Sequence, residues 1–219
     1  MEVITFAELS TMIYFSLNAK CYLNAEESEF KTFDLDTELG YFRTGENEVV
    51  IVYRGSCTVV DWKHNLRFWK SSFRYGGNND IKVHSGMNEK IGASFHFLEE
   101  KIKPTDTVYF TGHSLGGALA LLAAYATATQ IGAKVAGVYV FGSPPVGNDE
   151  WENAYNPILK NVTFDYMIKG DWVSFLPLKC FGYRSVGCET IRLEIPSYFP
   201  SFIHNHLPWQ YVAALRKST

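Results

Sequence analysis

The sequence predicts an α/β fold with a mostly parallel central sheet flanked by helices. Two observations lead to this prediction. Four short runs are dominated by β-branched and aromatic residues without polar alternation, which is typical of strands buried on both faces. Helical patterns alternate with these runs, as they do where right-handed helical crossovers join parallel strands. The predicted strands are Val49 to Tyr53, Thr107 to Thr111, Val135 to Phe141 and Val162 to Ile168.

The first helix is predicted to start near Thr5. Thr5 and Glu8 have the spacing of a capping box, in which a Thr caps the helix and an acidic residue three positions later returns a hydrogen bond. Apolar residues then recur at intervals of three and four, which indicates an amphipathic helix. These residues are Phe6, Leu9, Ile13 and Leu17.

Three further helices complete the alternation of elements. Apolar residues recur in steps of three and four from Met87 to Ile102, and Pro104 ends this pattern. Residues Leu115 to Gln130 are rich in Ala and Leu and offer almost no polar face, so this helix should be buried. Pro208 suits a first helical turn and is expected to open the last helix, with Tyr211 on its buried side.

Residues 181–185 and 190–195 are expected to pair as a β-hairpin. Cys180 and Cys188 could then meet across it, whereas the other two cysteines are far apart in the sequence. Because the start of the chain does not resemble a signal peptide, four thiols are the expected state, with a bond between Cys180 and Cys188 as the alternative.

Length and composition are those of one globular unit. The chain has 219 residues, of which 47% are hydrophobic and 20% charged, enough to bury a sizeable core. We therefore expect residues 1–219 to form a single domain. The net charge is -3 and no block of Lys or Arg occurs. A nucleic-acid partner is not expected, because phosphate binding needs a clustered basic patch.

The sequence predicts neither a membrane span nor a signal peptide. The longest apolar run, Leu115 to Ala128, is interrupted by glycines and is shorter than the ~20 residues that cross a bilayer. Residues 1–19 lack a basic region and include Glu2 and Glu8. We therefore expect a cytoplasmic protein, or a secreted one if the sequence is a mature form. The oligomeric state cannot be predicted.

A candidate nucleophile lies in the segment Gly112-His-Ser-Leu-Gly116, which fits the pattern G-x-S-x-G. The segment falls between a predicted strand and a predicted helix. In that context the pattern forms a sharp turn that raises Ser114 at the carboxyl ends of the strands, where α/β folds bind ligands. A serine is a weak nucleophile until a base removes its proton. A Gly-rich turn with an ordinary surface serine is the weaker alternative.

The base should be a histidine that follows Ser114, because folds with this turn carry Ser, Asp or Glu, and His in that order. Only His204 and His206 qualify. Alternating histidines can also bind a metal, but no third ligand accompanies these two, so no metal is expected. His84 and His113 precede the serine, and we expect them to have hydrogen-bonded structural roles.

The acid should follow a strand beyond the nucleophile. Asp171 lies two residues past the predicted strand that ends at Ile168. Asp165 lies inside the same strand, and Asp149 lies in the predicted loop after Phe141. The spacing favours Asp171 and leaves the other two as alternatives.

Six segments in this order resemble the class 3, or fungal-type, lipase family of α/β hydrolases. Several motifs in a fixed order are far more specific than one motif alone. The segments are Ile51 to Ser56 with Asp61-Trp62 and Asn65-Leu66, Val83 to Gly86, Thr111 to Ala120, Phe141 to Asn148, Lys169 to Pro177, and His206 with Tyr211. The chain departs from the family pattern at Ser174, where a proline is common.

The resemblance implies Ser114 as nucleophile, Asp171 as orienting acid and His206 as base. His206 is preferred over its neighbour because the family histidine usually stands five residues before a tyrosine. An oxyanion hole is expected from the backbone N–H of Leu115, the residue after the nucleophile. The resemblance places the second donor at Ser56.

Two apolar segments are candidates for substrate binding. The stretch Asp61 to Asn79 is rich in aromatic and basic residues, and the flap over the active site of related lipases lies in this neighbourhood. A helix that buries its aromatic side chains in the core is an equal alternative. The segment Ser197 to Ile203 precedes His206 and could line an acyl pocket, with plain packing as the alternative.

These observations predict a serine carboxylester hydrolase that forms an acyl-enzyme and needs no cofactor and no metal. The resemblance implies acylglycerols or other lipid esters as substrates, with the flap suited to a lipid interface. A phospholipase or an acyltransferase on the same scaffold is an alternative. A non-catalytic lipid-binding protein is another, although such a protein has no need for all three polar residues.

Overall fold

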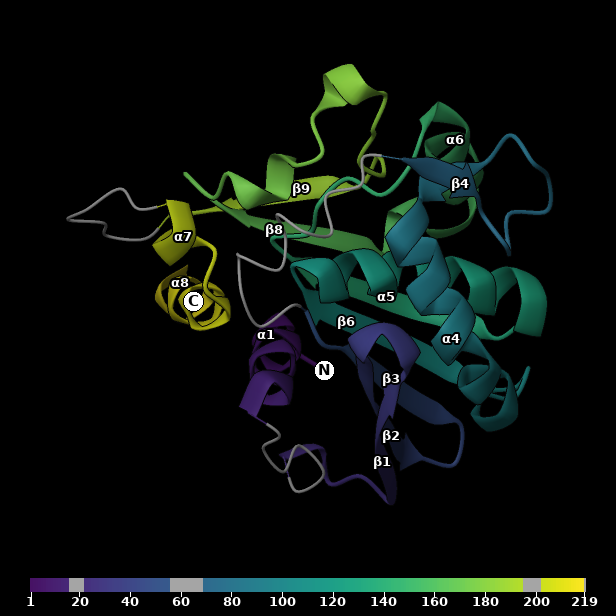
Figure 1. Cartoon of the computed structure of the whole chain (residues 1–219). Helices are drawn as coiled ribbons and strands as arrows, with labels where there is room; N and C mark the ends of the chain where they lie inside the picture. The colour runs from purple at the N-terminus through teal and green to yellow at the C-terminus, as the bar shows by residue number, and fades with distance from the viewer. Residues whose placement is uncertain (16–21, 56–68, 195–201, 219) are drawn as a thin grey trace.

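The computed structural model describes residues 1–15, 22–55, 69–194 and 202–218. A seven-stranded sheet runs through it in the order β1-β2-β3-β6-β7-β8-β9 (Figure 1). Its last five strands are mutually parallel, which confirms the predicted fold class. They are β3 (Glu48–Tyr53), β6 (Thr107–His113), β7 (Lys134–Phe141), β8 (Thr163–Ile168) and β9 (Glu189–Leu193).

The two strands at one end of the sheet were not predicted from the sequence. β1 (Glu27–Phe33) and β2 (Thr37–Gly45) pair antiparallel, and β2 pairs antiparallel with β3. β1 is largely exposed and carries charged residues, so it lacks a clear apolar pattern. A smaller antiparallel pair is formed by β4 (Lys70–Ser72) and β5 (Lys82–His84). Pairing with neighbours, rather than local sequence, makes these segments strands.

The predicted hairpin is wrong. β9 lies beside β8 and runs parallel to it, whereas residues 181–185 form no strand. The Arg184 backbone instead bridges to Gly147, with an N–H···O distance of 2.7 Å. Cys180 and Cys188 are free thiols. Cys21 and Cys57 lie outside the described residues.

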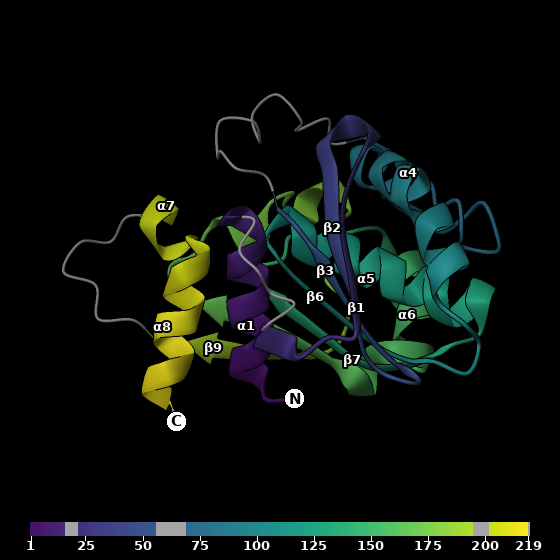
Figure 2. The ribbon, with the colours of Figure 1, turned by 90° about the horizontal axis from the view of Figure 1, so that it is seen from below.

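Helices cover both faces of the sheet (Figure 2). One face carries α4 (Ser85–Lys101), α5 (Leu115–Ala126), whose last turn continues as the π-helical segment Thr127–Ile131, and α6 (Asp149–Leu159). The other face carries α1 (Val3–Met12) and α8 (Pro208–Ser218). As predicted, α5 is buried along nearly its whole length.

Two helix starts differ from the prediction. The first helix begins at Val3, with Glu2 at the cap and no side-chain capping bond, so the predicted capping box at Thr5 is wrong. Asp149 opens α6 rather than lying in a loop, and Asn148 caps this helix by accepting the Trp151 N–H at 3.1 Å. The acidic first turn of α6 suits the positive end of the helix dipole.

The two ends of the chain meet on one face of the sheet. α1 and α8 lie side by side in both views, and Arg216 forms an ion pair with Glu8 at 2.5 Å (Figures 1 and 2). The Phe6 ring stacks on the Tyr139 ring of β7 at 4.1 Å. The Tyr211 and Leu215 side chains of α8 are buried in the same core. This packing fixes the residues that lead into α8 against the carboxyl edge of the sheet.

Replacing Asp106 with Ala should lower the free energy of unfolding by about 3 kcal/mol. Asp106 is fully buried just before β6 and accepts two hydrogen bonds from Arg43, at 2.9 and 3.0 Å. Burial would raise the pKa of Asp106, but the Arg43 guanidinium and the Lys103 N–H hold it below its usual range. The variant leaves a largely buried guanidinium without its counter-ion, which is costly. Urea unfolding measures the loss.

Asp34→Ala is the matched control, since Asp34 is exposed in the β1–β2 connection. It should change the unfolding free energy by less than about 0.5 kcal/mol. Equal losses in the two variants would contradict a stabilising role for the buried pair.

Candidate active site

Ser114 sits on a strained turn between β6 and α5. Its φ of 57° and ψ of -128° place a non-glycine residue in a sparsely populated region of backbone space. Helix α5 approaches the sheet closely at the flanking glycines. A Cβ on Gly116 would lie 2.3 Å from the Tyr53 carbonyl oxygen, and one on Gly112 would lie 2.3 Å from the Gly116 carbonyl oxygen. Only glycine fits at either position, as the G-x-S-x-G pattern predicts.

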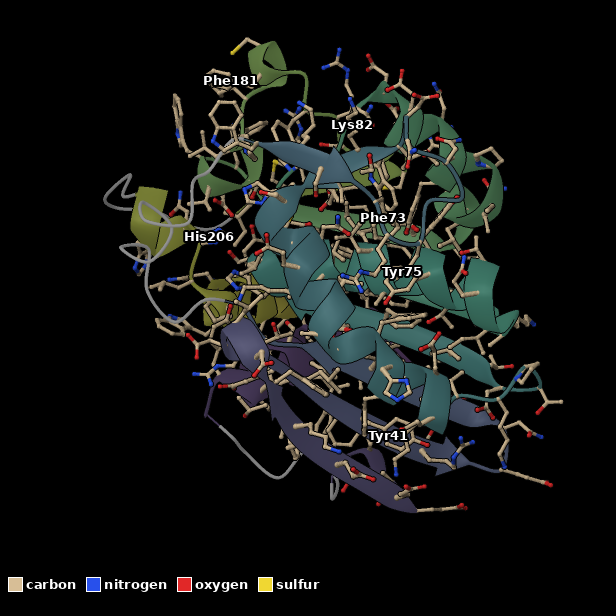
Figure 3. The ribbon with its side chains drawn as sticks, turned by 45° about the vertical axis from the view of Figure 1, so that its right-hand side comes forward. Tyr41, Phe73, Tyr75, Lys82, Phe181 and His206 are labelled. Carbon is tan, nitrogen blue, oxygen red and sulfur yellow. The ribbon has the colours of Figure 1, made fainter. Side chains whose placement is uncertain are left out.

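The structure brings the three predicted polar residues together. His206 Nε2 lies 2.8 Å from Ser114 Oγ, and His206 Nδ1 lies 2.8 Å from Asp171 Oδ2. A carboxylate only accepts hydrogen bonds, so Nδ1 carries the proton and Nε2 is left to accept the Ser114 hydroxyl. All three side chains are buried. His206 lies between α7 (Phe202–Asn205) and α8 (Figure 3).

The Asp171 carboxylate is held from several directions. Oδ2 accepts bonds from the Tyr211 hydroxyl and from the Ser174 hydroxyl, the latter at 2.9 Å, and Oδ1 accepts the Val173 N–H at 3.0 Å. Burial would raise the pKa of Asp171, but His206, Tyr211 and Ser174 together keep it below its ordinary value. The carboxylate therefore stays ionised and fixes the orientation of the imidazole.

The other candidate acids lie elsewhere. Asp149 forms an ion pair with Arg184 at 2.5 Å. Asp165 is buried inside β8, and its Oδ1 has no hydrogen-bond partner. Burial, with the nearby charge of Asp171, raises the pKa of Asp165 to about 7. Of the candidate bases, His204 is exposed and bonds to Gln210, so it does not face the serine.

His113 links the site to the start of the chain. Its Nδ1 lies 2.9 Å from the Tyr14 hydroxyl, and its ring centroid lies 4.7 Å from that of His206. Burial and the proximity of His206 keep the pKa of His113 well below its usual value, so the ring is neutral. The predicted structural role of His113 fits this contact. The sequence offered no signal for Tyr14, which lies outside the motifs that carry the resemblance.

One of the two expected oxyanion donors lies among the described residues. Leu115 is the first residue of α5, so its N–H has no acceptor within its own helix. The helix N-terminus favours negative charge at this point. Ser56, the other expected donor, lies outside the described residues, just past the end of β3.

The two candidate substrate-binding segments are only partly described. In the stretch Asp61 to Asn79, residues 61–68 lie outside the described residues, Trp69 is exposed, and Phe73 is buried against the core. Tyr75 packs on Phe95 with ring centroids 4.4 Å apart. Phe73 and Tyr75 thus pack on the core as that alternative expects, but directly after β4 and in a turn rather than in a helix. Residues 197–201 of the second segment are not described.

The described residues contain no helix that is both long and apolar enough to span a bilayer. Within those same ranges, no three His, Cys, Asp or Glu side chains gather as a metal site requires.

Residues 50–181 match the sequence profile of the class 3 lipases. The chain belongs to the class 3 lipase family. It is 35% identical over 148 residues to the secreted mono- and diacylglycerol lipase MDL3 of Malassezia globosa, covering 62% of this chain and 49% of that protein. It is 32% identical over 127 residues to phospholipase A(1) DAD1, chloroplastic, of Arabidopsis thaliana, covering 48% of this chain and 28% of that protein.

Solved structures share the α/β-hydrolase fold of this chain. The native Rhizomucor miehei lipase–propeptide complex aligns with a TM-score of 0.72 and 22% identity, covering 87% of this chain and 67% of that chain. Lipase II from Rhizopus niveus aligns with a TM-score of 0.70 and 21% identity, covering 89% and 80%. The chain spans less than half the length of the curated relatives just named.

Replacing Gly116 with Ala should lower the free energy of unfolding by about 2 kcal/mol. The new methyl group would overlap the Tyr53 carbonyl oxygen, and overpacking of this kind costs about 1–3 kcal/mol. Thermal and urea unfolding followed by circular dichroism measure the effect. Gly45→Ala is the control, because a Cβ there meets nothing within 4 Å. A Gly116 variant as stable as the Gly45 variant would contradict the close approach of α5 to the sheet.

Proposed function

We propose that the chain is a serine carboxylester hydrolase that cleaves acylglycerols or other lipid esters. One observation carries the proposal. The Ser114 hydroxyl, the His206 ring and the Asp171 carboxylate form a continuous line with two 2.8 Å separations, at the strained turn after β6. This arrangement turns a serine into a nucleophile, and a structural role for the turn would not require it.

The reaction begins when His206 Nε2 takes the Ser114 proton and Ser114 Oγ attacks the ester carbonyl carbon. The carbonyl oxygen becomes an oxyanion that faces the Leu115 N–H, with Ser56 as the expected second donor. His206 then protonates the leaving alcohol oxygen as the bond from carbon to that oxygen breaks. An acyl-enzyme remains on Ser114.

Water completes the cycle. His206 removes a proton from a water molecule, whose oxygen attacks the acyl carbon and forms a second oxyanion. This intermediate collapses, His206 returns its proton to Ser114 Oγ, and the carboxylic acid is released. Asp171 holds the useful tautomer of His206 throughout and stabilises the imidazolium in each half-reaction.

The lipid nature of the substrate is supported by the surroundings of the site. Exposed apolar side chains follow Asp171 along the chain, including Trp172, Phe175 and Phe181. Figure 3 labels Phe181 among them. Fungal relatives are named as mono- and diacylglycerol lipases. Hydrolysis of phospholipid is a second candidate, favoured by the plant relatives named as phospholipases A1.

Ser114→Ala should reduce the hydrolysis of a short-chain nitrophenyl ester by about 10⁵-fold or more, because the nucleophile is lost. The variant should keep the circular dichroism spectrum and melting temperature of the unmodified protein. An organophosphonate should label the unmodified protein at Ser114, as shown by peptide mass spectrometry. Retained turnover in the variant would overturn the assignment of the nucleophile, and a folded protein that takes no label would favour a lipid-binding protein.

Two neighbouring histidines provide a matched comparison for the base. His206→Ala should abolish hydrolysis, whereas His204→Ala should keep it, since His204 is exposed and bonds to Gln210. Equal losses in both variants would contradict the assignment of the base. Product analysis with emulsified diacylglycerol, triacylglycerol and phospholipid then separates a lipase from a phospholipase.

A further inference from the structure

Ser174 adds a hydrogen bond that the family pattern does not call for. It lies three residues after Asp171, in the short 3-10 segment Val173–Phe175, and its side chain is buried. The Ser174 hydroxyl donates to Asp171 Oδ2 at 2.9 Å. A proline, common at this position in the family, has neither a hydroxyl nor a backbone N–H. A chain with proline there cannot make this bond.

The hydrogen bond from Ser174 is one of three that Asp171 Oδ2 accepts. Asp171 Oδ2 accepts from His206 Nδ1, from the Tyr211 hydroxyl and from Ser174, whereas Oδ1 accepts only the Val173 N–H among the hydrogen bonds of the described residues. Three donors therefore share the charge of the oxygen that faces the imidazole. Each donor favours the ionised carboxylate over its protonated form.

Ser174 also acts on the imidazole, through the oxygen that they share. The Ser174 hydroxyl and the His206 Nδ1–H donate to the same carboxylate oxygen. The bond from Ser174 therefore offsets part of the negative charge that would otherwise attract a proton added to the ring. Both consequences, on the carboxylate and on the ring, favour a working base in more acidic solution.

We propose that Ser174 is a positioning residue that extends the activity of the Asp171–His206 pair to lower pH. The inference rests on the proposed function, because it treats His206 as the base for Ser114. Ser174 does not touch substrate in this role. It acts through the carboxylate, by keeping Asp171 ionised and by limiting the attraction between Asp171 and a protonated His206.

Other titratable groups face the pair and must be separated from Ser174. His113 from β6 is held neutral by burial and does not add a charge. Tyr211 from α8 keeps its proton, because burial and the charge of Asp171 raise its pKa well above the usual value. Asp165 from β8 has its pKa raised to about 7 by burial and by Asp171, so it titrates in the relevant range. An Asp165→Asn background removes that contribution.

The test is the pH profile of kcat/KM for a soluble short-chain ester, in the Asp165→Asn background and in the unmodified protein. Ser174→Ala should move the acid limb to higher pH by on the order of half a pH unit. Ser174→Thr keeps the donor and should restore the original acid limb. Ser10→Ala removes another buried hydroxyl, one bonded within α1, and should leave the profile unchanged.

A spectroscopic readout does not depend on turnover. The low-field proton resonance of the His206 Nδ1–H reports its bond to Asp171, and its change with pH can be followed by NMR in each variant. Ser174→Ala should shift this resonance and raise the pH at which it changes, whereas Ser174→Thr should not. If Ser174→Ala does not fold, Ser174→Cys takes its place, since it has a similar size and a much weaker donor.

The outcomes separate this inference from the proposed function. Ester hydrolysis with the same acid limb and the same resonance in Ser174→Ala would overturn the role of Ser174 and leave the hydrolase intact. A shifted resonance in a protein that hydrolyses no ester and takes no phosphonate label would support the bond and overturn the function. A Thr variant that behaves like the Ala variant would show that packing, not the donor, matters.

Discussion

The close approach of α5 to the end of the sheet is the constraint on which the site depends. Gly112 and Gly116 let the helix begin directly above the ends of β3 and β6. This approach forces Ser114 into a strained conformation and places the Leu115 N–H at the positive end of the helix. The strain persists because the buried helix and the parallel strands around it determine the path of the backbone. The same packing thus positions both the proposed nucleophile, Ser114, and the proposed oxyanion donor, the Leu115 N–H.

The site also depends on the buried carboxylate of Asp171. A carboxyl group as buried as Asp171 would be neutral without partners, and a neutral acid could not support a charged imidazole. Hydrogen-bond donors in the loop after β8, Val173 and Ser174, and in α8, Tyr211, keep the Asp171 carboxylate ionised. Asp165 behaves differently from Asp171. It lies nearby in β8, its Oδ1 lacks a hydrogen-bond partner, and its pKa is raised to about 7. Hydrogen bonding, more than depth of burial, distinguishes the two carboxyl groups.

The local pattern of apolar residues predicted the strands and the helix that are buried on all sides. It failed for segments that form strands only because they pair with a neighbouring strand. The strands around Val50, Phe110 and Val138 and the helix α5 were predictable because burial leaves an uninterrupted apolar run. β1 is exposed and charged, so only its partner β2 makes it a strand. The expected hairpin failed because β9 pairs with β8, a contact between segments that no local signal records.

The sequence by itself determined the chemistry of the site: a serine on a strand-to-helix turn, and an acid and a histidine in the order that the fold requires. It did so because the turn needs glycines at fixed spacing and because the motif order is specific. Tertiary structure showed that Asp171, which the spacing favoured over Asp165 and Asp149, faces His206. It alone decided how the charge of that carboxylate is held and that His113, bonded to Tyr14, lies beside the His206 ring. These contacts join residues 35 to 99 positions apart or depend on the direction of a side chain, and neither property is written in a local pattern.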